Sequence, residues 1–264
     1  RELRQLREAH GLTAEAVAEQ ADLSQSSLSR VENAVVQIKV PIVKALLDVY
    51  NVSGEQRDAL IALTREANRE NWWHAYGDVL PDWFEPYVDL EGEAEMLSVY
   101  DTQFVNGLLQ TEDYARALIS AARPEDSREE IDRRVELRMQ RQSRVLGGDL
   151  RLRLIVDECV LHRAYGGVDM MPAQIRRILE VADLRTVSLQ VLPADSPTGA
   201  VGAFTILEFP IGDPTVVYVE NDIGALYMEK PEHVRQYSRL CDRLRAAALS
   251  PEASVTHIAH LLEE

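Results

Sequence analysis

The sequence contains few residues that could form disulfides or bind metals. The two cysteines, Cys159 and Cys241, make neither a disulfide framework nor a metal-binding motif. We interpret both as small buried hydrophobic residues in a protein of the reducing cytoplasm. The six histidines are scattered and form no His-Glu-x-x-His pattern. We therefore expect no metal and no other cofactor.

Long apolar runs are also missing. A membrane helix needs roughly 18 or more apolar residues, whereas the longest apolar runs, within 152–156 and 215–219, have the length of strands. Residues 1–20 are charged and helix-like, unlike a signal peptide. Glycine (13) and proline (11) are not enriched, which excludes a collagen-like or low-complexity chain. We expect a globular cytoplasmic protein with no membrane contact.

Positive charge is scarce, and it is unevenly spread. The 264 residues hold 28 Lys+Arg against 44 Asp+Glu, a net charge of −16. Residues 1–70 are nearly neutral, with 9 basic and 11 acidic residues, and residues 71–264 hold 19 and 33. A chain this acidic does not bind nucleic acid over its whole surface. Any DNA-binding surface therefore belongs to the near-neutral first part.

Length and pattern predict two domains in an α+β fold. Residues 1–70 are expected to form an all-α, five-helix helix-turn-helix domain, with helix stops and starts at Gly11, Thr13, Ser24, Pro41 and Ser53. The segment 72–88 contains all three tryptophans and is interpreted as the seam between the domains. Residues 71–264 are expected to form a larger α+β regulatory, partner-binding and dimerisation domain with a small mixed sheet.

Within the second domain, the spacing of apolar residues changes along the chain from that of helices to that of strands. Residues 91–148 have a helical pattern, with N-caps at Thr111 and Ser127. From residue 150 on, strands are expected. One crossover connection would make one pair of strands parallel, and the remaining strands would pair antiparallel. The expected strands are 151–157, 187–192, 203–209 and 215–220, and the expected helices are 172–183, 231–249 and one that starts at Ser250.

The most informative pattern runs from residue 12 to 33. A short helix, a tight turn and a second helix with short polar exposed positions is the arrangement that places the second helix in the DNA major groove. Arg30 can pair with guanine and Gln25 with adenine, while amides near Thr13 and Ser24 can meet phosphates. A purely structural helical hairpin is the alternative.

The sequence Ser-x-Leu-Ser-Arg-Val-Glu-Asn, residues 26–33, resembles the Cro/CI-type, or XRE, helix-turn-helix regulators. The resemblance covers residues 1–60 and implies base-reading roles for Gln25, Ser26 and Arg30, with Ser27 and Ser29 beside them. The complete predicted DNA-binding set is Thr13, Ser24, Gln25, Ser26, Ser27, Ser29, Arg30 and Lys39.

The rest of the chain resembles the large C-terminal domain of actinobacterial XRE regulators, a group described as antitoxin-like. The resemblance rests on the runs Gly107–Arg116, Arg134–Arg138 and Leu189–Pro193, among others. It implies a small acidic partner protein, and it implies no established chemistry for the second domain.

An arginine-rich helix offers a further candidate site. Arg134, Arg138 and Arg141 share one helical face, which favours a dock for an acidic partner or for DNA that flanks the operator. The alternative is a solvated face whose arginines pair with acids such as Glu130 and Glu136.

Two other clusters are weaker candidates. Trp72, Trp73 and Tyr76 are a candidate pocket for a small-molecule effector at the domain seam, although such aromatics also pack cores and interfaces. Cys159 and His162 lie near each other in sequence, but adjacency does not establish a catalytic pair.

The sequence therefore predicts a sequence-specific transcriptional regulator and no enzyme. Its partners would be double-stranded operator DNA, a second copy in a homodimer, and a small acidic protein or a small-molecule effector. The alternatives are an antitoxin-like module that sequesters a small partner protein and, more remotely, an enzyme with a DNA-binding appendage.

Overall fold

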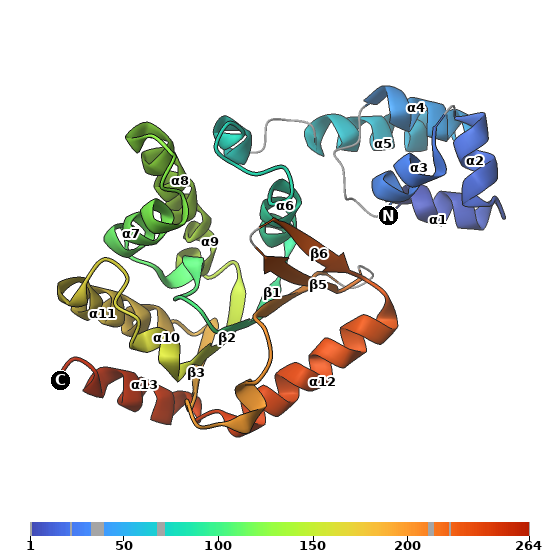
Figure 1. Cartoon of the computed structure of the whole chain (residues 1–264). Coiled ribbons are helices and arrows are strands. Elements are labelled where there is room, and N and C mark those ends of the chain that lie inside the picture. The colour runs from blue at the N-terminus through green and yellow to red at the C-terminus, as the bar shows by residue number, and fades with distance from the viewer. Residues whose placement is uncertain are drawn as a thin grey trace. The chain divides into compact units, whose positions relative to one another are not determined.

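The computed structural model describes residues 2–21, 23–32, 40–67, 72–210, 214–221 and 223–263. These residues belong to two compact units, 1–77 and 78–264, and the elements of each are labelled in Figure 1. Within the described ranges, no helix has both the length and the apolar character needed to cross a bilayer.

The first unit is helical, as the sequence predicts. The core includes five side chains with no exposed surface, Val17, Leu28, Leu46, Leu47 and Tyr50. These residues come from α2, α3, α4 and the residue that follows α4, so the apolar faces of these three helices form the centre of the unit. The described helices are α1 (Glu2–Ala9), α2 (Ala14–Gln20), α3 (Gln25–Glu32), α4 (Val40–Val49), α5 (Gly54–Ala67) and the short η1 (Trp72–Tyr76).

Two local signals that separate α1 from α2 are confirmed. Gly11 has φ +63°, a left-handed conformation that favours glycine where a helix ends. The Thr13 hydroxyl accepts a hydrogen bond from the Ala16 amide at 3.2 Å and caps α2.

The second unit contains a six-stranded mixed sheet in the order β3-β2-β1-β4-β5-β6. β1 pairs with β2, and β2 with β3, in parallel, whereas the pairs β1–β4, β4–β5 and β5–β6 are antiparallel. The strands are β1 (Met96–Asp101), β2 (Arg151–Asp157), β3 (Val187–Leu192), β4 (Phe204–Glu208), β5 (Val216–Asn221) and β6 (Gly224–Met228).

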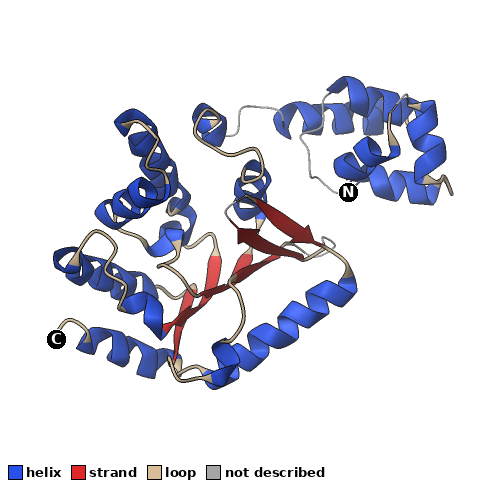
Figure 2. Ribbon diagram, viewed as in Figure 1, coloured by secondary structure: helices blue, strands red, loops and turns tan. Residues whose placement is uncertain are grey.

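Helices cover both faces of this sheet (Figure 2). On one face, Leu97 and Val99 pack among residues of α7, α11 and α13, and on the other Tyr100 and Phe204 pack with α12. The helices are α6 (Glu85–Glu93), α7 (Glu112–Ala122), α8 (Arg128–Arg141), α9 (Ser143–Gly147), α10 (Glu158–Leu161), α11 (Met171–Ala182), α12 (Pro231–Ala247) and α13 (Pro251–His260), with the short η2 (Gly107–Leu109), η3 (Val168–Met170) and η4 (Pro197–Gly199).

The predicted caps of this unit are also confirmed. Thr111 accepts from the Tyr114 amide and caps α7. Ser127 and Glu130 form a complete capping box at the start of α8. Ser250 accepts from the Ala253 amide and caps α13.

The α+β fold class is confirmed, but three details of the prediction are wrong. Residues 91–148 are not all helical, because β1 occupies 96–101. β1 is covered on both faces, so its sequence does not alternate between apolar and polar residues. The sheet contains two parallel crossovers rather than one, and β6 was not predicted.

Candidate functional site

The helix-turn-helix consists of α2 and α3. Val17 and Ala18 bury the inner face of α2, and Leu28 and Val31 bury that of α3. Gln25 and Ser29 are exposed on α3, and Ser24, directly before it, is exposed too. A buried apolar face with an exposed, short polar face is what a recognition helix needs.

The structure describes the other predicted DNA-binding residues only in part. The backbones of Ser26, Ser27 and Arg30 belong to α3, and their side chains lie outside the described residues, as does the whole of Lys39. Their roles in reading DNA therefore stay predictions.

An ion pair that sequence reasoning missed links α1 to the last residue of α3. Arg7 Nε and Nη2 donate to the two carboxylate oxygens of Glu32 at 2.7 and 2.9 Å, and Arg7 Nη1 donates to the Leu12 carbonyl at 3.1 Å. Glu32 is only 6% exposed, and its hydrogen bond raises the pKa of Arg7. The pair fixes the end of α3, and its 25-residue separation leaves no local sequence signal.

A cavity of about 290 Å³ lies in the second unit, between α6, α7 and α8 and the ends of β1, β4 and β5. Much of its wall is apolar or aromatic, including Trp83, Phe84, Phe104, Leu118 and Phe204. A cavity of this size with mostly apolar walls and a few polar groups is typical of a small-molecule site.

The three arginines of α8 that were predicted to form an outer dock line this cavity. Arg134 Nε donates to Asp126 at 2.7 Å, its Nη1 donates to the Val79 carbonyl, and its side chain is 19% exposed. The alternative of a solvated face is wrong, because Arg134 and Arg141 are largely buried. Its expectation that these arginines pair with acids of the same domain is confirmed for both, with Asp126 and Glu91 as partners rather than Glu130 and Glu136.

Arg141 is fully engaged by its surroundings. Its Nε and Nη2 donate to the carboxylate of Glu91 at 2.7 Å each, and its guanidinium lies 5.1 Å from the Phe84 ring centroid and 5.5 Å from that of Tyr87. Burial alone would lower the pKa of Arg141, but the charge and hydrogen bonds of Glu91 more than offset it and raise that pKa.

Arg138 differs from its two neighbours. Its Nη1 donates to the side-chain oxygen of buried Gln110 at 2.8 Å, yet no carboxylate among the described residues lies within 4.0 Å of its guanidinium. Burial, with repulsion from Arg141 and Arg134, lowers its pKa to about 10. At neutral pH it is a guanidinium with hydrogen-bond donors left for a ligand.

Two carboxylates line the cavity at the carboxyl ends of β1 and β5. Asp101 accepts from Asn106 Nδ2 at 3.0 Å, and Glu220 accepts from the Tyr218 hydroxyl. Burial raises the pKa of Asp101 to about 7, and the nearby charge of Glu220 adds to this effect. The cavity therefore contains positive and negative poles, which sequence spacing did not reveal because they come from α8, β1 and β5.

Comparison with family models agrees with this division of the chain. A model described as a domain of unknown function, DUF5753, matches residues 84–260. The chain belongs to the DUF5753 family. A model described as a helix-turn-helix domain matches residues 1–60, which indicates a DNA-binding regulator. No curated protein and no solved structure matches the chain.

The cavity lies almost wholly within the DUF5753 region, and residues other than the predicted aromatic set line it. Trp73 and Tyr76 are 5% and 8% exposed and belong to the first unit. The side chain of Trp72 lies outside the described residues. Burial of Trp73 and Tyr76 agrees with the alternative role, packing.

The DUF5753 region also holds the cysteine once considered as a nucleophile. The expectation of a buried cysteine is confirmed for Cys241 and wrong for Cys159, which is exposed. The hydrogen bond of Cys159 to Asp157 raises its pKa. A raised pKa favours the thiol over the thiolate, the reverse of what a nucleophilic cysteine requires. His162 is also exposed, directly after α10.

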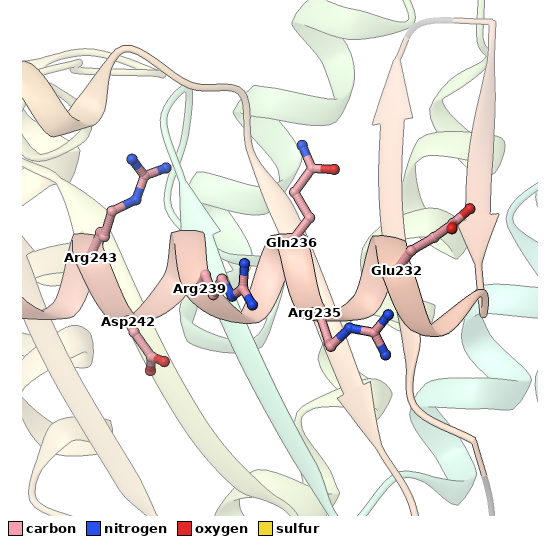
Figure 3. A pocket seen from close by; sticks show the side chains of 6 residues that line it. All are labelled: Glu232, Arg235, Gln236, Arg239, Asp242 and Arg243. Carbon is pink, nitrogen blue, oxygen red and sulfur yellow. The ribbon is translucent and has the colours of Figure 1, made fainter.

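A shallow hollow of about 750 Å³ follows the outer surface of α12 (Figure 3). Its lining is wholly polar or charged, and all six side chains are exposed. Arg235, Arg239 and Arg243 follow one another at four-residue spacing. We interpret this hollow as a charged surface rather than as a small-molecule site, because its lining residues are all charged or polar and all exposed.

Proposed function

We propose that this protein is a sequence-specific transcriptional regulator of the XRE type whose DUF5753 region senses an effector. The observation that carries the proposal is α3, a helix with a buried apolar face and an exposed polar face inside a matched helix-turn-helix domain. The resemblance of residues 26–33 to XRE regulators supports the finer assignment. DNA as the partner favours the cytoplasm as its location.

The proposed DNA-binding form is a homodimer. The first unit carries few basic residues, so one copy supplies few phosphate contacts. A two-fold dimer doubles these contacts and matches a two-part operator. Dimerisation would fall to the DUF5753 region.

The cavity supports the effector role of the DUF5753 region. Arg138 has donors left for a ligand, and the surrounding arginines are held by Glu91 and Asp126. A binding site with preorganised polar groups needs little reorganisation when its ligand arrives.

The antitoxin-like function is the second candidate, favoured by one surface. Because the arginines of α8 face the cavity, the exposed arginines of α12 are the better dock for a small acidic partner. We propose no catalytic role, and the raised pKa of Cys159 supports this view.

A titration of the full chain against DNA from its own promoter, at several salt concentrations, tests the regulator function. We expect log K to fall linearly with log salt concentration. Arg30→Ala should weaken binding by about 1–3 kcal/mol and relax specificity at one base. Arg4→Ala, which removes an exposed α1 arginine paired with Glu8, is the control and should have a much smaller effect.

Absence of binding to the promoter at every salt concentration, with and without a co-expressed acidic partner, would overturn the regulator function. Salt-independent binding of a partner protein with no DNA binding would favour the antitoxin-like module.

A further inference from the structure

The charged side chains of the cavity form a positive group and a negative group, and no ion pair within 4.0 Å joins the Arg138 and Glu220 side chains. Of the three α8 arginines that line the cavity, Arg138 is the one with no carboxylate of the described residues within 4.0 Å, and Glu220 is the carboxylate whose attraction opposes the fall in its pKa. The two residues sense each other's charge, yet no ion pair within 4.0 Å joins them. Space for a ligand group therefore remains between opposite charges.

The topology places the two carboxylates, Asp101 and Glu220, at the same end of their strands. β1 and β5 both run antiparallel to β4, so they point in the same direction. Asp101 ends β1, and Glu220 lies at the same end of β5, with the start of β4 between them. Carboxyl ends of neighbouring strands are a common place for ligand-binding groups.

The positive pole is held in place by helix α8. The Arg138 side chain lies against Gly107, whose missing Cβ would be 3.7 Å from Arg138 Cδ. Gln110, only 1% exposed, fixes one of its guanidinium nitrogens. The neighbouring Arg134 and Arg141 are neutralised by Asp126 and Glu91, so Arg138 is the principal anion anchor.

The ionised side chains nearly cancel. Arg134 and Arg141 balance Asp126 and Glu91, which leaves Arg138, and Arg123 directly after α7, opposite Glu220 and Asp101. A simple anion would be attracted by Arg138 and repelled by Glu220 and by the ionised fraction of Asp101, and a simple cation would meet the reverse. A molecule that carries both charges satisfies both poles.

We infer that the cavity binds a small zwitterion with an apolar body, an amino acid or a short peptide in its chemistry. Its acidic group is held by Arg138, its protonated amine lies towards Glu220 and Asp101, and its apolar part packs against Phe84, Phe104 and Phe204. The aromatic walls contribute apolar contact, and each buried charge has an opposite charge from the protein.

This inference names the ligand class for the proposed effector role and rests on that role only for its regulatory consequence. Ligand binding is measured on the full chain without DNA. A protein that binds the zwitterion and fails to bind DNA would refute the regulator and leave the site intact, and the reverse result would refute the site alone.

The probes are four matched aromatic compounds. L-phenylalanine and glycyl-L-phenylalanine carry both charges, 3-phenylpropanoate carries only the acid, and phenethylamine carries only the amine. Thermal unfolding shifts and calorimetric titration at millimolar concentration rank their affinities. We expect at least one zwitterion to bind tighter than both singly charged compounds by roughly tenfold or more, because each lost charged hydrogen bond removes that much affinity.

Two variants and one control test the poles. Arg138→Met and Glu220→Gln should each weaken zwitterion binding roughly ten- to hundredfold. Glu220 is exposed, so its substitution does not threaten folding. Arg133→Met removes an arginine from the same helix that pairs with Asp78, outside the cavity lining, and should leave binding unchanged.

Four results would overturn the inference. These are no binding by any of the four probes, equal affinity for acid and zwitterion, equal affinity for amine and zwitterion, and full zwitterion binding by a folded Glu220→Gln or Arg138→Met protein.

Discussion

Glu91 and Arg141 form a two-pronged ion pair in which both oxygen–nitrogen distances are 2.7 Å and the side chains are 5% and 10% exposed. The pair joins α6 to the end of α8. It also holds the guanidinium over Phe84 and Tyr87, so one contact fixes two walls of the cavity.

Glu91→Gln should therefore destabilise the second unit strongly. The substitution leaves Arg141 buried and charged without its counter-ion, a change that typically costs about 3–5 kcal/mol. Urea unfolding followed by tryptophan fluorescence measures it. The double variant Glu91→Leu with Arg141→Met should recover much of the loss, since no buried charge is then left unpaired. A loss under about 1 kcal/mol for Glu91→Gln would contradict this view.

In the first unit, Glu32→Gln should reduce both stability and DNA affinity. The variant keeps the shape of the side chain but removes the charge that holds Arg7 near the end of α3. The free energy of unfolding should fall by about 1–3 kcal/mol. Arg4→Ala, at an exposed pair, should change stability by less than about 0.5 kcal/mol. Equal losses of stability for the two substitutions would show that the buried pair contributes no more than the exposed pair.

Gln174 connects α11 to the start of α7. It is completely buried, its Nε2 donates to the Leu109 carbonyl at 2.9 Å and its Oε1 accepts from the Thr111 amide at 2.9 Å. Gln174→Leu leaves the Leu109 carbonyl and the Thr111 amide without this partner. We expect the free energy of unfolding to fall by about 1–3 kcal/mol for each group left unpaired. Thermal unfolding measures the change. Gln236→Leu, at an exposed position of α12, serves as the control and should change stability little.

Stability should depend on pH through Asp101. Its pKa is about 7 in the folded protein, raised from an ordinary value of 3.8 by burial and then by Glu220. Between these values the folded state keeps a proton that the unfolded state releases, so this contribution to stability falls as pH rises from about 4 to about 7 and then levels off. The hydrogen bond from Asn106 acts in the opposite direction.

Asp101→Asn tests this dependence. Because asparagine does not ionise, the variant should gain stability relative to the original protein at pH 8, with little difference at pH 4. Glu220→Gln should reduce the same slope, since it removes the charge that adds to the shift. Melting temperatures compared at both pH values give the result, and a constant difference would contradict it.

Local signals predicted much of the fold. Gly11, Thr13 and Ser127 mark helix ends by chemistry that acts within four residues, and each lies where the sequence placed it. β1 was missed because a strand covered on both faces loses its alternation. The edge strand β6 was missed because only its pairing with β5 defines it.

The sequence did not predict the cavity, because residues distant in the sequence form it. The helical spacing of Arg134, Arg138 and Arg141 correctly predicted a shared face but not the environment of that face. Glu91 lies 50 residues from Arg141, and Glu220 comes from another strand. Such pairings depend on tertiary packing, which no local pattern encodes.

The central position of β1 has a consequence for synthesis of the chain. Its parallel neighbour β2 leaves the ribosome about 50 residues after β1, whereas its antiparallel neighbour β4 follows about 100 residues after it. Until then one edge of a buried, apolar strand is open to pairing with other nascent chains. A chain whose translation terminates after β3 would have Arg138 but lack Glu220, and its β1 would keep an unpaired edge that favours aggregation. Translation through β5 is therefore the step that both protects the sheet and completes the site.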